Sequence, residues 1–327
     1  MNGRKINMHQ DYTPLNCILP LEQSVSSYPA QIGKYTSCEV YDDLASEQEE
    51  ADARMITHLL DILQGKEDMS VVVRSSDTDV ECLLLHYFTV YGMKGTLIMD
   101  SGVGDNRRLI DINCVAENIG TEACCSVVGW HYYTGSDTTS ALVRRGKVRP
   151  WKLLLRFPQY MQAFAQLGMC ETLDEKYVTI LEEFHCKIYG DNKEKSINKL
   201  RYKRFIKSFT PKSSLLSTSC GTDASLLPPC SSSVRQHIQR VNYQSYISKN
   251  AARPLLDIPD PCLHGWTTDG SGFLVPQWLG DEMMPAELED IVLKIDINND
   301  DENPDADLVE SQEFQQHSIL DTIYEEA

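Results

Sequence analysis

Three groups of carboxylates stand in the first half of the chain at spacings that suit a metal centre. The groups are Glu49 and Glu50 with Asp52, then Asp77 with Asp79, and then Asp137. Carboxylates that converge in a fold repel one another, and a hard divalent cation both neutralises them and holds phosphate oxygens. The pattern therefore predicts a site for Mg²⁺ or Mn²⁺ that acts on phosphate groups.

A basic segment follows the third group closely. Its residues are Arg144, Arg145, Gly146, Lys147 and Arg149. Between residues 144 and 207 the chain has fifteen bases and seven acids, so this region suits contact with the phosphate backbone of DNA or RNA. A charged helix face in solvent is the alternative explanation.

The expected elements place the acids at one sheet edge. Residues 69–74 form a short β-branched run that predicts a buried strand, and Asp77 and Asp79 follow its carboxyl end. Ligand sites of open α/β sheets form at that edge. A helix is expected over residues 47–64, with its acids in the first turn.

Each acidic group also has a purely structural explanation. Acids in a first helical turn complement the helix dipole. Asp77 or Asp79 could cap a helix over residues 80–91, and Asp137 could cap one over 138–144. Taken singly, the structural explanation is favoured for each group. Taken together, and with the basic segment beside them, the groups favour a metal site.

These motifs resemble the second half of the PIN-like nuclease domain of flap endonucleases and XPG-type nucleases. The matching features are Glu-Ala-Asp at 50–52, Asp-x-Asp at 77–79, and Gly-Ser-Asp at 135–137 before a basic turn. The resemblance implies a parallel sheet with flanking helices, followed by a mainly helical region. It also implies a helix-turn-helix, begun by the Gly-Ser-Asp motif, that holds a nucleic-acid backbone.

Carried over residue by residue, the resemblance implies roles for both groups of charges. The metal-site carboxylates would be Glu50, Asp52, Asp77, Asp79 and Asp137. The nucleic-acid contacts would come from Arg144, Arg145, Gly146, Lys147 and Arg149. Gly146 matches the second glycine of the family's Gly-x-Gly turn, whereas Arg144 occupies the place of the first.

A closer likeness covers residues 38 to 290. The phrases at 49–54, 76–80 and 134–140 resemble uncharacterised animal proteins that are spread by mobile elements. The nuclease family begins with a strand that carries an acid, and this chain lacks that segment. We therefore expect a truncated copy with weak or no nuclease activity. The alternatives are a catalytically dead scaffold or interaction protein derived from a mobile element, or a nonfunctional remnant.

The sequence predicts an α/β fold in several segments. They are a loosely ordered segment (1–37), a partial PIN-like domain with a helix-turn-helix (38–157), a helical extension (158–210), a linker (211–233), a helix with tryptophan-containing loops (234–293) and an acidic, disordered tail (294–327). Strands are expected near 38–41, 71–74, 96–99 and 109–112. Further helices are expected over 160–167, 173–189, 196–208 and 234–252.

The charge distribution and the cysteine content limit the classes of protein to which this chain can belong. From residue 281 onward the chain has sixteen acids and one base, so this region carries most of the formal charge of −18. The eleven cysteines lack zinc spacing, and we expect reduced thiols. The apolar stretches are short and no signal-peptide core is present, so we expect no membrane association and an intracellular location, nuclear or cytoplasmic. Oligomeric state and the partner of the acidic tail stay open.

Overall fold

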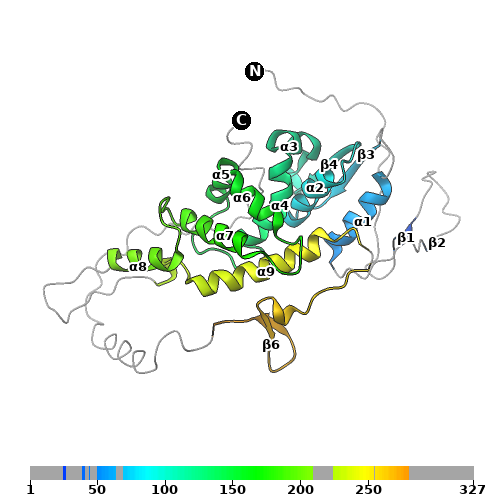
Figure 1. Ribbon diagram of the computed structural model, residues 1–327. Coiled ribbons are helices and arrows are strands. Elements are labelled where there is room, and N and C mark those ends of the chain that lie inside the picture. The colour runs from blue at the N-terminus through cyan, green and yellow to red at the C-terminus, as the bar shows by residue number, and fades with distance from the viewer. Residues whose placement is uncertain are drawn as a thin grey trace, which may run out of the picture.

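The computed structural model of the chain describes residues 25–26, 39–40, 44, 50–63, 69–208, 224–253 and 255–279 (Figure 1). Most of the predicted N-terminal segment 1–37, most of the predicted linker 211–233 and the acidic tail 294–327 lie outside these residues. Glu49 lies outside them as well. The fold is α/β.

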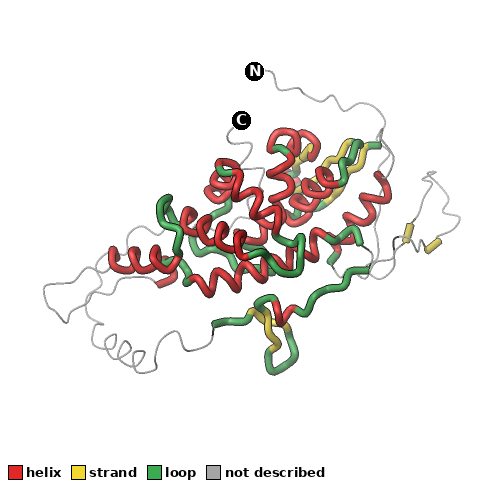
Figure 2. The backbone as a smooth tube through the Cα atoms, viewed as in Figure 1, coloured by secondary structure: helices red, strands yellow, loops and turns green. Residues whose placement is uncertain are grey.

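A small mixed sheet stands at one end of the helical body (Figure 2). Its strands are β3 (Ser70–Arg74), β4 (Thr96–Ser101) and β5 (Arg108–Asp111), in the spatial order β3-β4-β5. The β3–β4 pair is parallel, with Val72 opposite Ile98. The β4–β5 pair is antiparallel, with Met99 opposite Ile110. The predicted parallel sheet is therefore confirmed for the first pair and wrong for the second.

The lengths of the connections explain this mixed arrangement. Helix α2 (Thr78–Val90) connects β3 to β4, and a crossover helix is what a parallel pair requires. Only residues 102–107, with a 3₁₀ turn at Gly104–Asn106, connect β4 to β5. Six residues cannot carry the chain back across the sheet, because a crossover needs about a dozen residues or more. The chain therefore reverses as a hairpin.

The other two sheets of the described residues are antiparallel pairs of short strands. The first pairs β1 (Val25–Ser26) with β2 (Glu39–Val40), where a strand is predicted near 38–41. The second pairs β6 (Trp266–Thr268) with β7 (Leu274–Pro276), in a region predicted as loops. The three central strands fall within three residues of the predicted ranges.

Helices surround a central one, α4 (Thr121–Thr134). The others are α1 (Ala51–Leu63), α3 (Ile112–Ile119), α5 (Val148–Arg156), α6 (Pro158–Gln166), α7 (Glu175–Ile188), α8 (Ile197–Ser208) and α9 (Ser231–Lys249). Eleven of the fourteen residues of α4 are buried, which is expected of a helix that is covered on all sides. Helices α2, α6 and α9 pack against it (Figure 1).

The predicted helices are confirmed with small shifts at their ends, with one exception. The helix predicted over 138–144 is wrong, because residues 135–147 form a loop. Hydroxyl side chains in this loop bond to each other and to the backbone. Ser136 Oγ lies 2.9 Å from Thr139 Oγ1, and Thr139 Oγ1 donates to the carbonyl of Tyr132 at 2.6 Å. Such local bonds compete with helix formation.

Helix α9 begins at Ser231, three residues inside the predicted linker. Among the helices that the structure describes, none has the length and the apolar character that a membrane span requires.

Gly129 allows α4 and α6 to approach closely. A Cβ atom on this residue would stand 2.5 Å from the carbonyl oxygen of Phe164 and 3.0 Å from the Cβ atom of Leu167. Alanine favours a helix over glycine by about 1 kcal/mol. Here the steric cost exceeds that gain, because the contact is with backbone that has no room to move.

We therefore expect Gly129→Ala to lower the free energy of unfolding by about 2 kcal/mol. Gly146→Ala is the matched control, since a Cβ atom there meets nothing within 4 Å, and its effect should stay within about 0.5 kcal/mol. Urea denaturation of the two variants measures both values. Equal stability of the two variants would show that the α4–α6 crossing tolerates an added methyl group.

Candidate metal centre

The loop between β3 and α2 holds two of the predicted carboxylates. Asp77 is the N-cap of α2, and its Oδ1 atom accepts a hydrogen bond from the backbone N–H of Asp79 at 2.9 Å. The structural role that the sequence allows for Asp77 is thus present. The hydroxyls of Ser75 and Ser76 accept bonds from the N–H groups of Asp77 and Gly102, at 3.1 Å each. These bonds fix the loop beside the end of β4.

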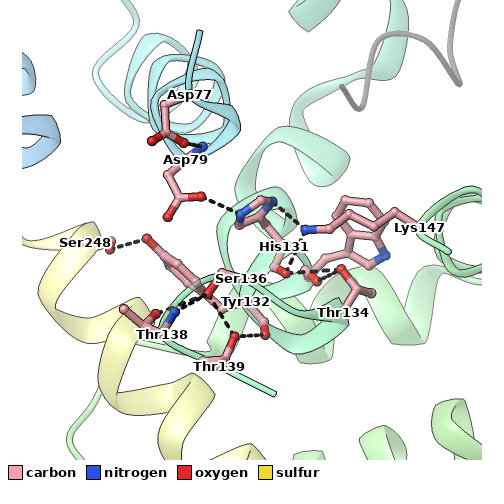
Figure 3. Close-up of polar contacts among 11 residues, drawn as sticks. Asp77, Asp79, His131, Tyr132, Thr134, Ser136, Thr138, Thr139, Lys147 and Ser248 are labelled. Carbon is pink, nitrogen blue, oxygen red and sulfur yellow. Dashed lines mark hydrogen bonds and ion pairs between the residues drawn. The ribbon is translucent and has the colours of Figure 1, made fainter. Parts of the chain in front are cut away.

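Asp79 has a different environment. Its side chain points away from the cap and reaches His131 on the last turn of α4, where the Asp79 Oδ1 to His131 Nε2 distance is 2.7 Å (Figure 3). Lys147, just before α5, lies 3.0 Å from the other ring nitrogen, Nδ1. Lys147 Nζ also donates to the carbonyl of His131 at 3.3 Å. One carboxylate, one imidazole and one ammonium therefore form a continuous chain.

The donors and acceptors in this chain assign the tautomer of His131. An ammonium group can only donate, so Nδ1 must accept from Lys147 and carries no proton. The proton of the neutral ring is then on Nε2, which donates to Asp79. Burial lowers the pKa of His131, and the neighbouring Asp79 only partly offsets this effect. The ring is thus a neutral bridge between a cation and an anion.

The same contacts set the charge states of Asp79 and Lys147, which lie on either side of His131. Burial alone raises the pKa of Asp79, but the hydrogen bond from His131 and the positive charge of Lys147 outweigh it, and the pKa lies below its ordinary value. Burial lowers the pKa of Lys147 to about 8, although Asp79 acts in the opposite direction. Asp79 is therefore a fixed carboxylate with a neighbouring positive charge.

Asp137 lies in the loop that follows α4. Gly135 ends the helix with φ +114°, and a Cβ atom there would stand 2.6 Å from Cα of Ala141. Only glycine combines that backbone angle with this close approach. Ser136 Oγ also lies 3.1 Å from Thr138 Oγ1, so hydroxyl contacts hold the turn on both sides of Asp137 (Figure 3). Asp137 itself is exposed.

Asp52 lies in the first turn of α1, and Glu50 comes directly before that helix. Burial and, to a smaller extent, the charges of four other carboxylates raise the pKa of Asp52 to about 6. The four are Asp77, Asp79, Glu50 and Asp137. The structure therefore brings the other four predicted carboxylates, from the start of α1, the start of α2 and the loop after α4, within electrostatic range of Asp52.

This grouping is loose when judged as a metal site. Among the described residues, no three acidic, histidine or cysteine side chains stand close enough together to hold one ion. The donor set is nevertheless entirely oxygen, as hard cations require. Mg²⁺ commonly retains several waters and takes only one or two carboxylates from a protein, with phosphate oxygens as further ligands. An ion bound to these carboxylates would therefore have to keep most of its water ligands.

The basic segment does not form a single surface. Arg144 and Arg149 are exposed, and Arg144 has a left-handed backbone with φ +52°. Lys147 points to His131, and Arg145 lies over the ring of Tyr189, 4.8 Å from its centre. Gly146 stands in open space, so nothing in its surroundings requires a glycine. The predicted basic surface is therefore divided, because Lys147 lies against His131 whereas Arg145 lies against Tyr189.

Sequence analysis missed three residues at this site. The first is His131, which bonds Asp79. Tyr132 carries its hydroxyl to Ser248 of α9, with the two oxygens 2.8 Å apart (Figure 3). The one available signal was the position of His131, six residues before Asp137 in a helix that ends at the Gly-Ser-Asp motif. No local pattern points to Ser248, which lies 116 residues from Tyr132 in the sequence.

One further acid at the same sheet edge has a structural role. Asp100, at the end of β4, accepts hydrogen bonds from Arg74 at 2.7 Å and from Arg107 at 2.7 and 2.9 Å. The hydrogen bonds from Arg107 are the main reason that the pKa of Asp100 lies below its ordinary value. Its charge is thus already compensated by the two arginines.

Comparisons with models of protein families, with curated proteins and with solved structures find no match to this chain. The site must therefore be interpreted from its own geometry.

The raised pKa of Asp52 gives a pH dependence of stability with a definite sign. Ionisation of Asp52 is less favourable in the folded protein than at its ordinary pKa of 3.8, so its charge destabilises the fold as pH rises toward 6 and beyond. The rise of this pKa from 3.8 to about 6 corresponds to about 3 kcal/mol, and solvent screening of this half-exposed group reduces the effect to roughly 1 kcal/mol.

We expect Asp52→Asn to raise the free energy of unfolding by roughly 1 kcal/mol at neutral pH in a chelator, with no gain below pH 3.8. Asp61→Asn, an exposed acid on the same helix, is the control for the loss of one charge. Urea denaturation over a series of pH values measures both. The same gain in both variants would contradict a special environment for Asp52.

Proposed function

We propose that this chain is a domain of the PIN-like nuclease type that binds a divalent cation and, through it, the phosphodiester backbone of nucleic acid. In this proposal the domain has little or no nuclease turnover. The observation that carries it is the convergence of five carboxylates from three separate segments on the surroundings of Asp52. Repulsion within such a group is a cost that a bound cation removes.

The roles follow from the positions of the side chains. Asp52, Asp77 and Asp137 would hold Mg²⁺ or Mn²⁺ directly or through water, and Glu50 would add charge at the rim. Asp79 would accept the ion on the side away from His131, since His131 and Lys147 orient its carboxylate. A bound cation would supply neutralisation of phosphate charge and activation of a water molecule. Phosphate oxygens would complete its coordination.

Low turnover is proposed because Asp79 is already partly neutralised. Two-metal phosphodiester chemistry needs enough carboxylate charge to hold two ions about 4 Å apart. Here the ammonium of Lys147, acting through His131, takes up part of that charge. A single weakly held ion is consistent with this balance. The same pairing supports the second candidate function, a scaffold whose site is held together by Lys147 without any metal.

The effect of Mg²⁺ on stability and binding tests the proposal. A ligand that binds only the folded state raises the melting temperature. We expect Mg²⁺ to raise the melting temperature of the wild-type chain and of Asp61→Asn, and to have little effect on Asp52→Asn. In the same buffers, fluorescence anisotropy should show tighter binding of a labelled DNA duplex with Mg²⁺ than with chelator, by about tenfold, or about 1.4 kcal/mol.

The outcomes separate the two functions. Equal stabilisation of Asp52→Asn and Asp61→Asn by Mg²⁺ would exclude the acid group as the metal site and favour the scaffold. Incubation of flap, duplex and single-stranded substrates with Mn²⁺ tests turnover. Robust cleavage that disappears in Asp79→Ala would show that the domain is an active nuclease.

A further inference from the structure

A group of three arginines lies at the carboxyl end of α7, apart from the acidic residues. Arg145 lies over the ring of Tyr189 with 4.8 Å between its guanidinium carbon and the ring centre, and the same distance for Arg204 of α8 is 5.9 Å. A Cβ atom on Gly190 would stand 3.4 Å from Nη2 of Arg149 and 3.6 Å from Nη2 of Arg204. We call these three residues the arginine cluster.

Helix capping explains only part of this arrangement. Arg149 donates to the carbonyl of Lys187 at 3.4 Å, and Arg204 donates to the carbonyl of Tyr189. Cations near the last turn of a helix are favoured by its dipole. These bonds use one nitrogen from each of two side chains, whereas every guanidinium has five N–H donors. Capping therefore leaves most of the donors of the cluster unexplained, and all those of Arg145.

The cluster carries excess positive charge. In the part of the chain that the structure describes, none of the three arginines is paired with a carboxylate. The negative charge of Asp191 acts on Arg204, but Oδ1 of Asp191 already accepts hydrogen bonds from the backbone N–H groups of Lys193 and Glu194, at 2.9 Å each. Burial lowers the pKa of Arg145, and the charges of Arg204 and Arg149 lower it further. Like charges this close normally face an anion.

Two buried nitrogens add an independent observation. The Nε atoms of Arg145 and Arg204 are inaccessible to solvent and have no hydrogen-bond partner in the described residues. A buried donor without a partner costs about 1–3 kcal/mol, and more when it is charged. Contacts among the described residues therefore leave these two donors of the arginine cluster unsatisfied.

The surroundings favour a polymer over a free ion. Helix α8 lies at the end of the molecule away from the sheet (Figure 1) and has five bases and no acid. Its bases are Lys199, Arg201, Lys203, Arg204 and Lys207. Tyr202, on the same helix, is 65% exposed, so an aromatic ring stands among these charges. Bases with an exposed aromatic side chain suit a nucleic-acid strand.

The segment 145–149 connects this surface to the acidic residues. Lys147 points to His131 and Asp79, whereas Arg145 and Arg149, two residues away on either side, point to Tyr189 and Gly190. Residues two apart in the chain are separated by at most about 7 Å. Phosphates on one strand can therefore lie over both places.

We propose that Arg145, Arg149 and Arg204 form a phosphate-binding site over Tyr189 that holds one phosphodiester group of a nucleic-acid strand. This inference rests on the proposed function, since it names the part of the chain that grips the backbone beside the acidic group. It adds Arg204, Tyr189 and α8 to the interface. Binding of a phosphate group by the arginine cluster needs no metal ion.

Binding of labelled single-stranded and duplex oligonucleotides in chelator tests the proposal. The variants are Arg149→Gln and Arg149→Gln with Arg204→Gln. The control is Lys176→Gln with Arg235→Gln, which removes the same charge from the exposed pairs with Asp174 and Glu175. We expect the double cluster variant to bind about tenfold more weakly than the control. The slope of log K against log salt should fall by about 0.7 for each phosphate of a single strand that the variant no longer neutralises.

Capping by Arg204 means that its loss can weaken the fold, so melting temperatures accompany every binding measurement. If the double variant does not fold, Arg149→Gln and Arg149→Lys decide, because Arg149 is exposed. Arg149→Lys keeps the charge but not the forked geometry, and should bind with intermediate affinity. Wild-type affinity and slope in Arg149→Gln would overturn the proposal.

Two further outcomes bear on the ligand. Equal weakening by the cluster variant and the control would show general charge attraction and would overturn a specific site. Loss of inorganic phosphate binding with unchanged oligonucleotide binding would show a site for a free anion, which also contradicts the proposal. All of these measurements are made in chelator, and Asp61→Asn should bind as wild type there, so a failure of the metal site leaves this result interpretable.

Discussion

The contact between Asp79 and His131 is the constraint on which the site depends. It joins the start of α2, which follows the sheet, to the end of α4, which is the centre of the helical core. His131 is almost fully buried, and its neutral ring needs an acceptor for Nε2 and a donor for Nδ1. Asp79 and Lys147 meet these needs.

The position of Asp137 depends on the same contact. The turn at Gly135 begins one residue after α4 ends, and Thr139 returns to bond the carbonyl of Tyr132. Placement of the end of α4 therefore also places the loop after it. With α1 packed against α2, the acids of α1 approach from the other side. Three segments that are distant in the sequence thus share one electrostatic environment.

Most of the elements could be predicted from the sequence because their signals are local. The β-branched run at Val71–Val73 and the apolar spacing of α1 and α7 depend only on near neighbours. The direction of β5 is set by the length of the connection from β4, which also appears in the sequence. The expected helix after Asp137 came from a capping pattern and from a family resemblance, whereas the hydroxyl groups of Ser136, Thr138 and Thr139 favour a loop.

The site was predictable only in part. The carboxylates were found because acids at strand ends and helix starts form a pattern. His131 and the divided directions of Arg145, Lys147 and Arg149 were not found, because they depend on contacts across long sequence separations. His131 meets a residue 52 positions away, and Arg204 acts on Tyr189 from another helix. Such contacts leave no periodic pattern in the amino-acid sequence.

The two charged places in the structure complement each other. Burial and neighbouring carboxylates raise the pKa of Asp52 in the acidic group, and guanidinium groups of the arginine cluster gather around Gly190. The segment 145–149 contributes to both, since Lys147 serves the first and its neighbours serve the second. A ligand with a metal ion and phosphates would satisfy the two together, which is the physical reason to connect them in one account.

The central claim is that the carboxylates around Asp52 act as one group that a cation can neutralise. NMR titration of the Asp52 side-chain carboxyl, with and without Mg²⁺, tests it most directly. The account predicts a midpoint of about 6 in chelator and a clearly lower midpoint in Mg²⁺. A midpoint near the ordinary value of 3.8 under both conditions would contradict it.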